Sequence, residues 1–198
     1  MQELFEKAQK LRNNGQIKEA ISLYKEVRSS VLKTDRHLAS ECLHMIGVSY
    51  YQSENFDEAG KNLTSSLKEF EEQSDPQFSG FVLRDLGMVA RGENKFHEAK
   101  EFLNRSIEKL QGNNGHEGMT RVKLGRVLAE EGNFDGAYEE INRGIILLEN
   151  SSETFFLSSA YLDRAKVDTL KSLHVLDSFS KKDEFKERRK EIKKILGN

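Results

Sequence analysis

A short pattern of small and aromatic residues recurs along this chain at a nearly constant interval. In its clearest copy Gly87 precedes Ala99 by twelve residues, Phe96 lies between them, and a break falls at Gly92–Asn94. The same skeleton occurs three more times, as Ala8/Ile17/Ala20, Gly47/Phe56/Ala59 and Gly125/Phe134/Ala137. The alanines follow one another at intervals of 39, 40 and 38 residues. Internal repetition at a fixed period dictates architecture, so the chain is predicted to be an array of similar units.

Each copy of the pattern fits two amphipathic helices joined by a tight turn. In the first copy, residues 2–13 and about 17–33 place apolar residues at spacings of three and four. Asn14-Gly15 lies between them and favours a left-handed turn that ends the first helix. Two helices joined by so short a turn are expected to pack antiparallel.

The small residues predict a close approach between the two helices of a pair. Glycine inside a helix costs about 1 kcal/mol relative to alanine. Gly47, Gly87 and Gly125 therefore require a packing reason. A larger side chain at the crossing point would push the backbones apart and open a void beside it.

Repeat boundaries follow from the pattern as far as about residue 150. We expect a helical array over residues 1–172, with repeats at about 1–34, 35–73, 74–112 and 113–150, a degenerate repeat at 151–180, and a basic capping helix at 181–198. Ala165 lies forty residues after Gly125, but the position twelve further on is Asp177. Terminal units of arrays are usually atypical because one face must be solvated. Residues 111–118 (QGNNGHEG) are expected to form a flexible loop.

Composition supports a helical protein of the cytoplasm. Pro76 is the only proline, and proline is the strongest helix breaker. Cys42 is the only cysteine, so no intramolecular disulfide can form and a reducing compartment is favoured. The N-terminus has neither an apolar signal core nor a transmembrane run.

Charge is unevenly distributed along the chain. It holds 31 basic and 33 acidic residues, a net charge of −2. Residues 181–198 contain eight basic and four acidic residues, or +4, which leaves −6 for the remainder. An acidic chain with a short basic C-terminal segment lacks the charge distribution typical of a dedicated nucleic-acid-binding protein. The tail could contact an anionic membrane or nucleic acid, but its interspersed glutamates favour a cap or a helix that docks on another subunit.

The pattern of a small residue, an aromatic or apolar residue and an alanine on paired helices resembles the tetratricopeptide repeat. The resemblance is strong over about residues 1–150 and partial over 151–172. It departs from the family in its period of 38–40 residues, in the missing repeat-closing proline, and in Leu4, Leu43 and Leu83 where the signature tryptophan would stand. The resemblance implies an all-α, right-handed superhelical solenoid of antiparallel helix pairs, whose concave groove is lined by the first helix of each pair.

A candidate partner-binding groove follows from the positions beside each small residue on these first helices. Its residues are His44, Met45, Val48, Tyr51, Phe81, Arg84, Met88, Arg91, Met119, Lys123, Arg126 and Lys166. Exposed methionine and aromatic side chains would suit a peptide or helix of a partner. The basic members would suit acidic side chains or a carboxylate. The alternative interpretations are packing between adjacent units for the apolar members, and surface pairing with Asp85, Glu130 and Asp163 for the basic members.

One known binding mode of the family is not supported. Its chaperone adaptors hold a C-terminal carboxylate with a set of lysines and asparagines. The corresponding positions here are Phe5, Gln9, Met45, Phe81 and Asp85, or one unit later His44, Val48, Asp85, Met119 and Lys123. Neither set matches. Peptide-pheromone receptors with long repeats remain an alternative resemblance, although we do not expect a DNA-binding helix-turn-helix or an extra helical domain before the array.

Catalysis, cofactors and metals have no support in the sequence. The five histidines are scattered, and His37 and His44 stand too far apart on one helix to share a metal unaided. Cys42 is expected to be a buried, inert thiol. No phosphate loop, paired-histidine zinc motif or nucleophile elbow occurs. We therefore expect no enzyme activity and no cofactor.

The sequence as a whole predicts an interaction protein. The expected function is a scaffold that binds a protein or peptide partner in the concave groove, and an acidic and apolar peptide is the candidate partner. Nucleic-acid and membrane partners are not expected, and a homodimer through the C-terminal helix is a further option. The alternative functions are a regulatory peptide sensor and an accessory subunit of a larger complex.

Overall fold

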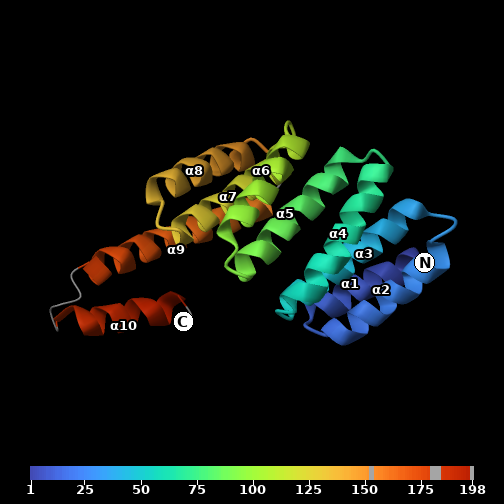
Figure 1. Ribbon diagram of the computed structural model, residues 1–198, viewed down its shortest axis with the longest axis horizontal. Helices are drawn as coiled ribbons and strands as arrows, with labels where there is room; N and C mark the ends of the chain where they lie inside the picture. Colours follow the sequence, from blue (N-terminus) through green and yellow to red (C-terminus); the bar gives the residue numbers. More distant parts are fainter. Residues whose placement is uncertain (152–153, 179–183, 197–198) are drawn as a thin grey trace. The chain divides into compact units, whose positions relative to one another are not determined.

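The computed structural model of the 198-residue chain describes residues 1–151, 154–178 and 184–196, and all of the described secondary structure is α-helical (Figure 1). The chain divides into two compact units, Met1–Leu110 and Gln111–Asn198. The first unit contains α1 (Gln2–Asn13), α2 (Ile17–Val31), α3 (Arg36–Gln52), α4 (Phe56–Glu72), α5 (Pro76–Gly92) and α6 (Phe96–Leu110). The second contains α7 (Asn114–Glu130), α8 (Phe134–Glu149), α9 (Thr154–Ser178) and α10 (Glu184–Leu196). The all-α prediction is confirmed.

Helices that follow one another in a unit pack side by side, which confirms the predicted helix pairs. The pairs α1/α2, α3/α4, α5/α6 and α7/α8 are each joined by three residues. The middle residue of each turn has a positive φ angle, and these residues are Gly15, Glu54, Asn94 and Gly132. Glycine and asparagine adopt this left-handed conformation most readily, which explains why such residues recur at these turns.

Side-chain caps fix where five of the helices begin. Asp35, Asn55, Asp75, Asn113 and Asn133 each accept a hydrogen bond from the backbone N–H three residues ahead. Such caps satisfy backbone donors that have no partner inside the helix. The single proline follows one of these caps, at the first position of α5, where the missing N–H costs nothing.

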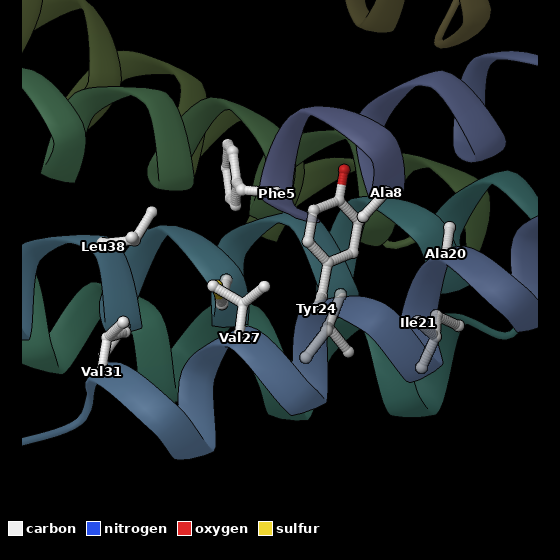
Figure 2. Packing of buried hydrophobic residues seen from close by; sticks show 11 residues of the cluster. Phe5, Ala8, Ala20, Ile21, Tyr24, Val27, Val31 and Leu38 are labelled. Carbon is white, nitrogen blue, oxygen red and sulfur yellow. The ribbon is translucent and has the colours of Figure 1, made fainter. Parts of the chain in front are cut away.

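The core of the first helix pairs is built from the stripes that the sequence pattern predicts. Figure 2 shows Phe5 and Ala8 of α1 facing Tyr24 and Val27 of α2, with Leu38 of α3 beside them. Ala8, Tyr24 and Val27 have no exposed surface, and the rings of Phe5 and Tyr24 meet edge to face with centroids 5.4 Å apart. A second cluster continues across α4 and α5 around Leu63, Phe70 and Leu83.

The repeated small residues lie where the two helices of a pair approach each other, as predicted. A Cβ atom added at Gly47 would stand 2.6 Å from Leu63 Cγ, and one at Gly87 would stand 2.7 Å from Leu103 Cγ. The equivalent atom at Gly125 would stand 2.5 Å from Ile141 Cγ1 and 2.8 Å from the Ala137 carbonyl oxygen. These distances leave no room for a side chain.

A second close contact lies seven residues before the small residue on α3, α5 and α7. The Ser66 hydroxyl donates to the Ser40 carbonyl at 3.0 Å, and the Ser106 hydroxyl donates to the Gly80 carbonyl at 2.7 Å. In the second unit the same place is taken by Gly118 and Gly144, whose backbones approach too closely for a Cβ atom on either residue. Two small positions, seven residues apart, therefore mark α3, α5 and α7.

The loop expected over residues 111–118 is wrong for most of that stretch. α7 begins at Asn114, and the Asn113 side chain caps it by accepting from His116 N–H. Gly115 and Gly118 are buried inside this helix, and Gly118 packs against α8. Gly118 therefore serves helix contact rather than chain flexibility.

A polar network ties α2, α3 and α4 together. Arg28 of α2 holds the Glu69 carboxylate of α4 through two nitrogen–oxygen contacts of 2.6 and 3.1 Å. Arg28 also donates to the Ala39 carbonyl at 2.6 Å, and the Ser40 hydroxyl donates to Glu69 at 2.8 Å. Burial by itself would raise the pKa of the Glu69 carboxyl, but the hydrogen bonds from Arg28 and Ser40 outweigh it and lower that pKa.

The region expected to hold a degenerate fifth repeat contains a single described helix, α9, of 25 residues. It packs on α7 and α8, with Ala160, Asp163 and Val167 buried against them. The break expected near residues 178–182 lies mostly outside the described residues. α10 contacts α9, and its role as a cap stays a prediction.

Candidate partner-binding surface

Eleven of the twelve predicted groove residues lie on the first helices of their pairs, and Lys166 lies on α9. α3 carries His44, Met45, Val48 and Tyr51, α5 carries Phe81, Arg84, Met88 and Arg91, α7 carries Met119, Lys123 and Arg126, and α9 carries Lys166. Eight of them belong to the first compact unit and four to the second. The residues therefore form one set on each unit, and a continuous groove through both stays a prediction.

Two of the twelve residues are buried within the first unit. His44 is 4% exposed and Met88 is 8% exposed, whereas the other ten are half-buried. In this structure His44 and Met88 contribute to the packing of α3 and α5 rather than to an open surface. The sequence could not separate these two positions from their neighbours because both lie on the same stripe.

His44 is buried because Asp85 satisfies its polarity. His44 Nε2 lies 2.7 Å from Asp85 Oδ2, and Arg84 Nε lies 3.4 Å from Asp85 Oδ1. Burial would raise the pKa of the Asp85 carboxyl, but the Arg84 charge and the His44 hydrogen bond outweigh it and lower the pKa. Asp85 is therefore ionised at neutral pH and links α3 to α5. This contact between charged groups agrees with the pairing interpretation for Arg84.

An aromatic cluster adjoins this link at the start of α5. The rings of Phe70 and Phe78 stack with centroids 4.9 Å apart, and Phe81 meets Phe78 at 5.3 Å. The Arg84 guanidinium lies over the Phe81 ring at 5.6 Å, a cation–π geometry. The half-buried Phe81 and Arg84 thus form a flat apolar and cationic surface on α5.

The remaining α3 residues are partly engaged in packing. Met45 packs against the core of the first helix pairs, and its sulfur accepts a hydrogen bond from Arg12 at 3.3 Å. Val48 and Tyr51 pack against the second core cluster, and the Tyr51 ring lies 5.9 Å from that of Phe56. These contacts fit the packing interpretation, while the half-exposed parts of the side chains still face solvent.

In the second unit three predicted basic residues converge on one buried carboxylate. Lys123 Nζ lies 3.0 Å from Asp163 Oδ2, and Arg126 Nη1 lies 3.2 Å from Asp163 Oδ1. Lys166 Nζ reaches to 3.7 Å from Asp163 Oδ1. The Asp163 side chain is only 3% exposed, whereas that of Lys166 is 45% exposed. Asp163 thus links α7 to α9, and the three basic side chains around it lie closer to solvent than the carboxylate does.

Asp85 and Asp163, the two carboxylates that link adjacent helices, occupy equivalent positions in their repeats, and the predicted groove set did not include them. Asp85 lies two residues before Gly87, and Asp163 lies two residues before Ala165. In both cases the carboxylate contacts a basic or histidine side chain of the preceding first helix. An acidic residue two places before the small residue was therefore a signal in the sequence for a link between adjacent first helices.

The described residues contain no group of three histidine, cysteine or acidic side chains placed to hold a metal ion. Within the same part of the chain, no helix has both the length and the apolar character needed to cross a bilayer. Cys42 is fully buried, and burial raises the pKa of its thiol to about 12.

Neither a family model nor a curated protein matches the sequence. Among solved structures, the chain is similar to aspartyl phosphate phosphatase F from Bacillus subtilis, with a TM-score of 0.77 and 12% identity over 98% of this chain and 56% of that one. It therefore spans little more than half the length of that protein.

Two further structures cover more of their own length. BtubC (BKLC) from P. vanneervenii gives a TM-score of 0.70 and 18% identity over 96% of this chain and 78% of that one. A putative kinesin light chain with TPR-like repeats from Podosopora anserina gives a TM-score of 0.64 and 16% identity over 98% and 94%. From these likenesses and its successive helix pairs, the chain has the all-helical fold of tetratricopeptide-like repeat proteins.

Proposed function

We propose that the chain binds a protein or peptide partner through the half-exposed faces of its first helices, and that this partner offers an acidic side chain or a carboxylate. The observation that carries the proposal is the convergence of Lys123, Arg126 and Lys166 on Asp163. The proposed function is binding, without chemistry of its own.

The charge balance at Asp163 favours an anion. Three cations around one carboxylate give these four side chains a formal charge of +2. Partial burial reduces solvent screening, so a carboxylate that reaches them forms stronger hydrogen bonds than it would on an open surface. Lys166 is the cation best placed to turn toward a ligand, because it is the most exposed and the farthest from Asp163.

Apolar surface beside these charges supports a peptide rather than a free anion. Met119 lies half-buried on α7, four residues before Lys123 and so on the same side of the helix. On the first unit, Phe81 and Arg84 provide the stacked surface described above. Paired-helix arrays commonly present such faces to a segment of a partner, and the half-exposed side chains here are adaptable or aromatic.

The test compares two single charge reversals in the intact chain. We expect Lys166→Glu to lose a partner that the unaltered chain captures from source lysate, whereas Lys193→Glu, an equal change on the exposed face of α10, retains it. Bound proteins would be identified by mass spectrometry, and the binding of the recovered partner would be measured by fluorescence anisotropy at two salt concentrations. Equal capture by both variants would contradict the proposal.

A second candidate function is a regulatory peptide sensor. It is supported by the division of the chain into two compact units at Leu110–Gln111. A sensor of this kind would change its radius of gyration when the peptide binds, whereas a static scaffold would not. Small-angle X-ray scattering of the free and peptide-bound chain distinguishes the two functions.

A further inference from the structure

One face of α9 is open to solvent although it carries the residues of a helix contact. Phe155 is 79% exposed and Leu162 is 58% exposed, and Ser158 and Ala165 between and beyond them are exposed as well. Residues at these spacings share one side of a helix. We call Phe155, Ser158, Leu162, Ala165 and Thr169 the open face of α9.

The small residues of this face correspond to covered positions in the other repeats. Ser158 and Ala165 lie forty residues after Gly118 and Gly125. In α7 those two glycines pack directly against α8, with Leu148 and Ile141 over them. In α5 the same two positions, Gly80 and Gly87, are covered by Leu110 and Leu103 of α6. By this correspondence, the open face of α9 is a surface shaped to receive a second helix.

α10 is too short to be that helix along the whole of α9. Its 13 residues span about 20 Å, whereas the 25 residues of α9 span about 37 Å. Arg188 and Ile192 of α10 line a hollow together with Ser172 and Val175, which belong to the C-terminal part of α9. In the N-terminal half of α9, the side that carries Phe155, Ser158 and Leu162 is left exposed by the described helices, while the opposite side packs on α7 and α8.

The open face also matches the pattern of the helices that cover such positions. The second helices share a pattern of four residues. It begins with a small residue, continues with Leu or Ile at the fourth position after it and a second small residue at the seventh, and ends with a large residue at the eleventh. These sets are Ala59/Leu63/Ser66/Phe70 in α4, Ala99/Leu103/Ser106/Leu110 in α6 and Ala137/Ile141/Gly144/Leu148 in α8. Ser158, Leu162, Ala165 and Thr169 have the same spacing, with a smaller last residue. One face of α9 therefore carries the pattern of both members of a pair.

We propose that the open face of α9 binds the same face of a second copy of this chain, with the two α9 helices antiparallel across a two-fold axis. In the antiparallel pair α5/α6, Gly80 contacts Leu110 and Gly87 contacts Leu103. A step of seven residues forward along α5 thus corresponds to a step of seven residues backward along α6. The same offset on α9 places Leu162 of the second copy over Ala165, and Thr169 of the second copy over Ser158. The residue numbers of Leu162 and Ala165 add up to the same value as those of Ser158 and Thr169. A single two-fold axis can therefore form both contacts at once, as an isologous dimer requires.

The most exposed aromatic residue has a place in this arrangement. The same offset brings Phe155 of each copy to Ser172 of the other. Ser172 lines a hollow of about 520 Å³, together with Tyr138, Val175 and Ile192. Phe155 would enter the apolar side of this hollow, which removes from water the most exposed large apolar side chain in the described residues. The dimer does not depend on the peptide-binding proposal, since Lys166 and Asp163 lie outside the open face.

Sedimentation velocity over a concentration range tests the dimer in the intact chain. A contact limited to one helix pair is smaller than a standard interface, so we expect a monomer–dimer equilibrium with a Kd on the order of micromolar. Leu162→Asp should raise this Kd at least tenfold, while its circular dichroism melt should match that of the unaltered chain. Ile195→Asp on α10 and Ile146→Asp on α8 are matched controls, because both isoleucines are also exposed and should leave the Kd unchanged.

Cysteine cross-linking tests the arrangement without altering the face by a charge. In a Cys42→Ala background, we expect Leu162→Cys mixed with Ala165→Cys, and Ser158→Cys mixed with Thr169→Cys, to form disulfides between copies of different mass. Ser158→Cys mixed with Leu162→Cys is the control. In the proposed dimer, Leu162 faces Ala165 of the other copy, and Ser158 lies seven residues from Ala165, or about 10 Å along the helix.

Each remaining outcome overturns the proposal. A chain that stays monomeric at 100 times the expected Kd excludes the dimer. A dimer that survives Leu162→Asp, or that Ile195→Asp disrupts as strongly, places the contact elsewhere, in the second case on α10. Control disulfides as abundant as those of the matched pairs exclude the antiparallel offset.

Discussion

At the scale of single residues, this fold places charged groups where helices meet. Arg28 lies on the inward side of α2, among apolar residues, because Glu69 and the Ala39 carbonyl satisfy its donors. His44 is buried because Asp85 lies 2.7 Å away. Removing one member of such a pair leaves a partly buried charge without its partner, which costs more than loss of an exposed ion pair.

Glu69→Gln tests this at the Arg28 network. We expect a loss of about 1 kcal/mol in the free energy of unfolding at pH 7, because the amide keeps the shape but not the charge. The pKa of Glu69 is lowered from its ordinary 4.5. Its contribution to stability is therefore complete above about pH 4.5 and is lost as pH falls through the lowered folded-state pKa. The difference between the two proteins should thus shrink below pH 4.5, as measured by urea denaturation at several pH values.

Glu72→Gln is the matched control for this prediction. Glu72 pairs with Arg36 at 3.0 Å, but both side chains are largely exposed. Exposed pairs contribute little, so this variant should change stability by less than about 0.5 kcal/mol at any pH. Equal losses in Glu69→Gln and Glu72→Gln would contradict a special role for the Arg28 network.

The candidate site was predictable by helix and side, but not residue by residue. The stripe rule places His44, Arg84 and Lys123 on first helices, where the structure has them. It does not say which of them finds a partner. Asp85 is 41 residues from His44 and Asp163 is 40 from Lys123, so the burial of His44 and of Lys123 depends on contacts between repeats. Periodicity within one helix does not contain that information.

At the scale of helices, one sequence rule explains most of the packing: a small residue lies where the two helices of a pair cross. The substitution Gly125→Ala tests this rule. Alanine forms helices better than glycine by about 1 kcal/mol, yet its Cβ would stand 2.8 Å from the Ala137 carbonyl oxygen. Because backbone cannot move aside cheaply, we expect a net loss of about 1–3 kcal/mol in the free energy of unfolding, measured by chemical denaturation.

Gly60 provides the opposite case within the same fold. It lies inside α4, and an added Cβ would meet only Val89 Cγ1, at 4.0 Å, an ordinary contact. Gly60→Ala should therefore stabilise the chain, by up to about 1 kcal/mol. If both glycine variants shifted stability in the same direction, helix propensity rather than helix contact would explain these positions.

The same rule explains where sequence reasoning failed at this scale. Residues 111–118 suggested a loop because glycine and asparagine favour turns. Gly118 is nevertheless a contact residue seven places before Gly125, as Gly80 is before Gly87. Composition alone could not distinguish a glycine needed for flexibility from one needed for proximity, but the spacing of seven could. α9 departs from the pairs for the converse reason, since its small residues are present and none of the described helices covers them.

At the scale of the whole chain, the division into Met1–Leu110 and Gln111–Asn198 means that each unit has its own core. The clusters around Tyr24 and Phe70 belong to the first unit, and the cluster around Ile141 belongs to the second. In repeat proteins stability is approximately a sum of local terms and nearest-neighbour terms, so opening need not involve the whole chain at once.

Hydrogen exchange should therefore report the two units separately. In Gly125→Ala, whose strain lies between α7 and α8, we expect faster amide exchange in those helices and unchanged exchange in α2 and α4. Gly87→Ala strains α5 against Leu103 of α6 and should show the converse, with α8 unchanged. Mass spectrometry of peptides from each helix, under conditions where exchange reports opening free energy, measures both. If either variant accelerated exchange equally in all protected helices, the chain would open as one cooperative body, and the two cores would not be independent in stability.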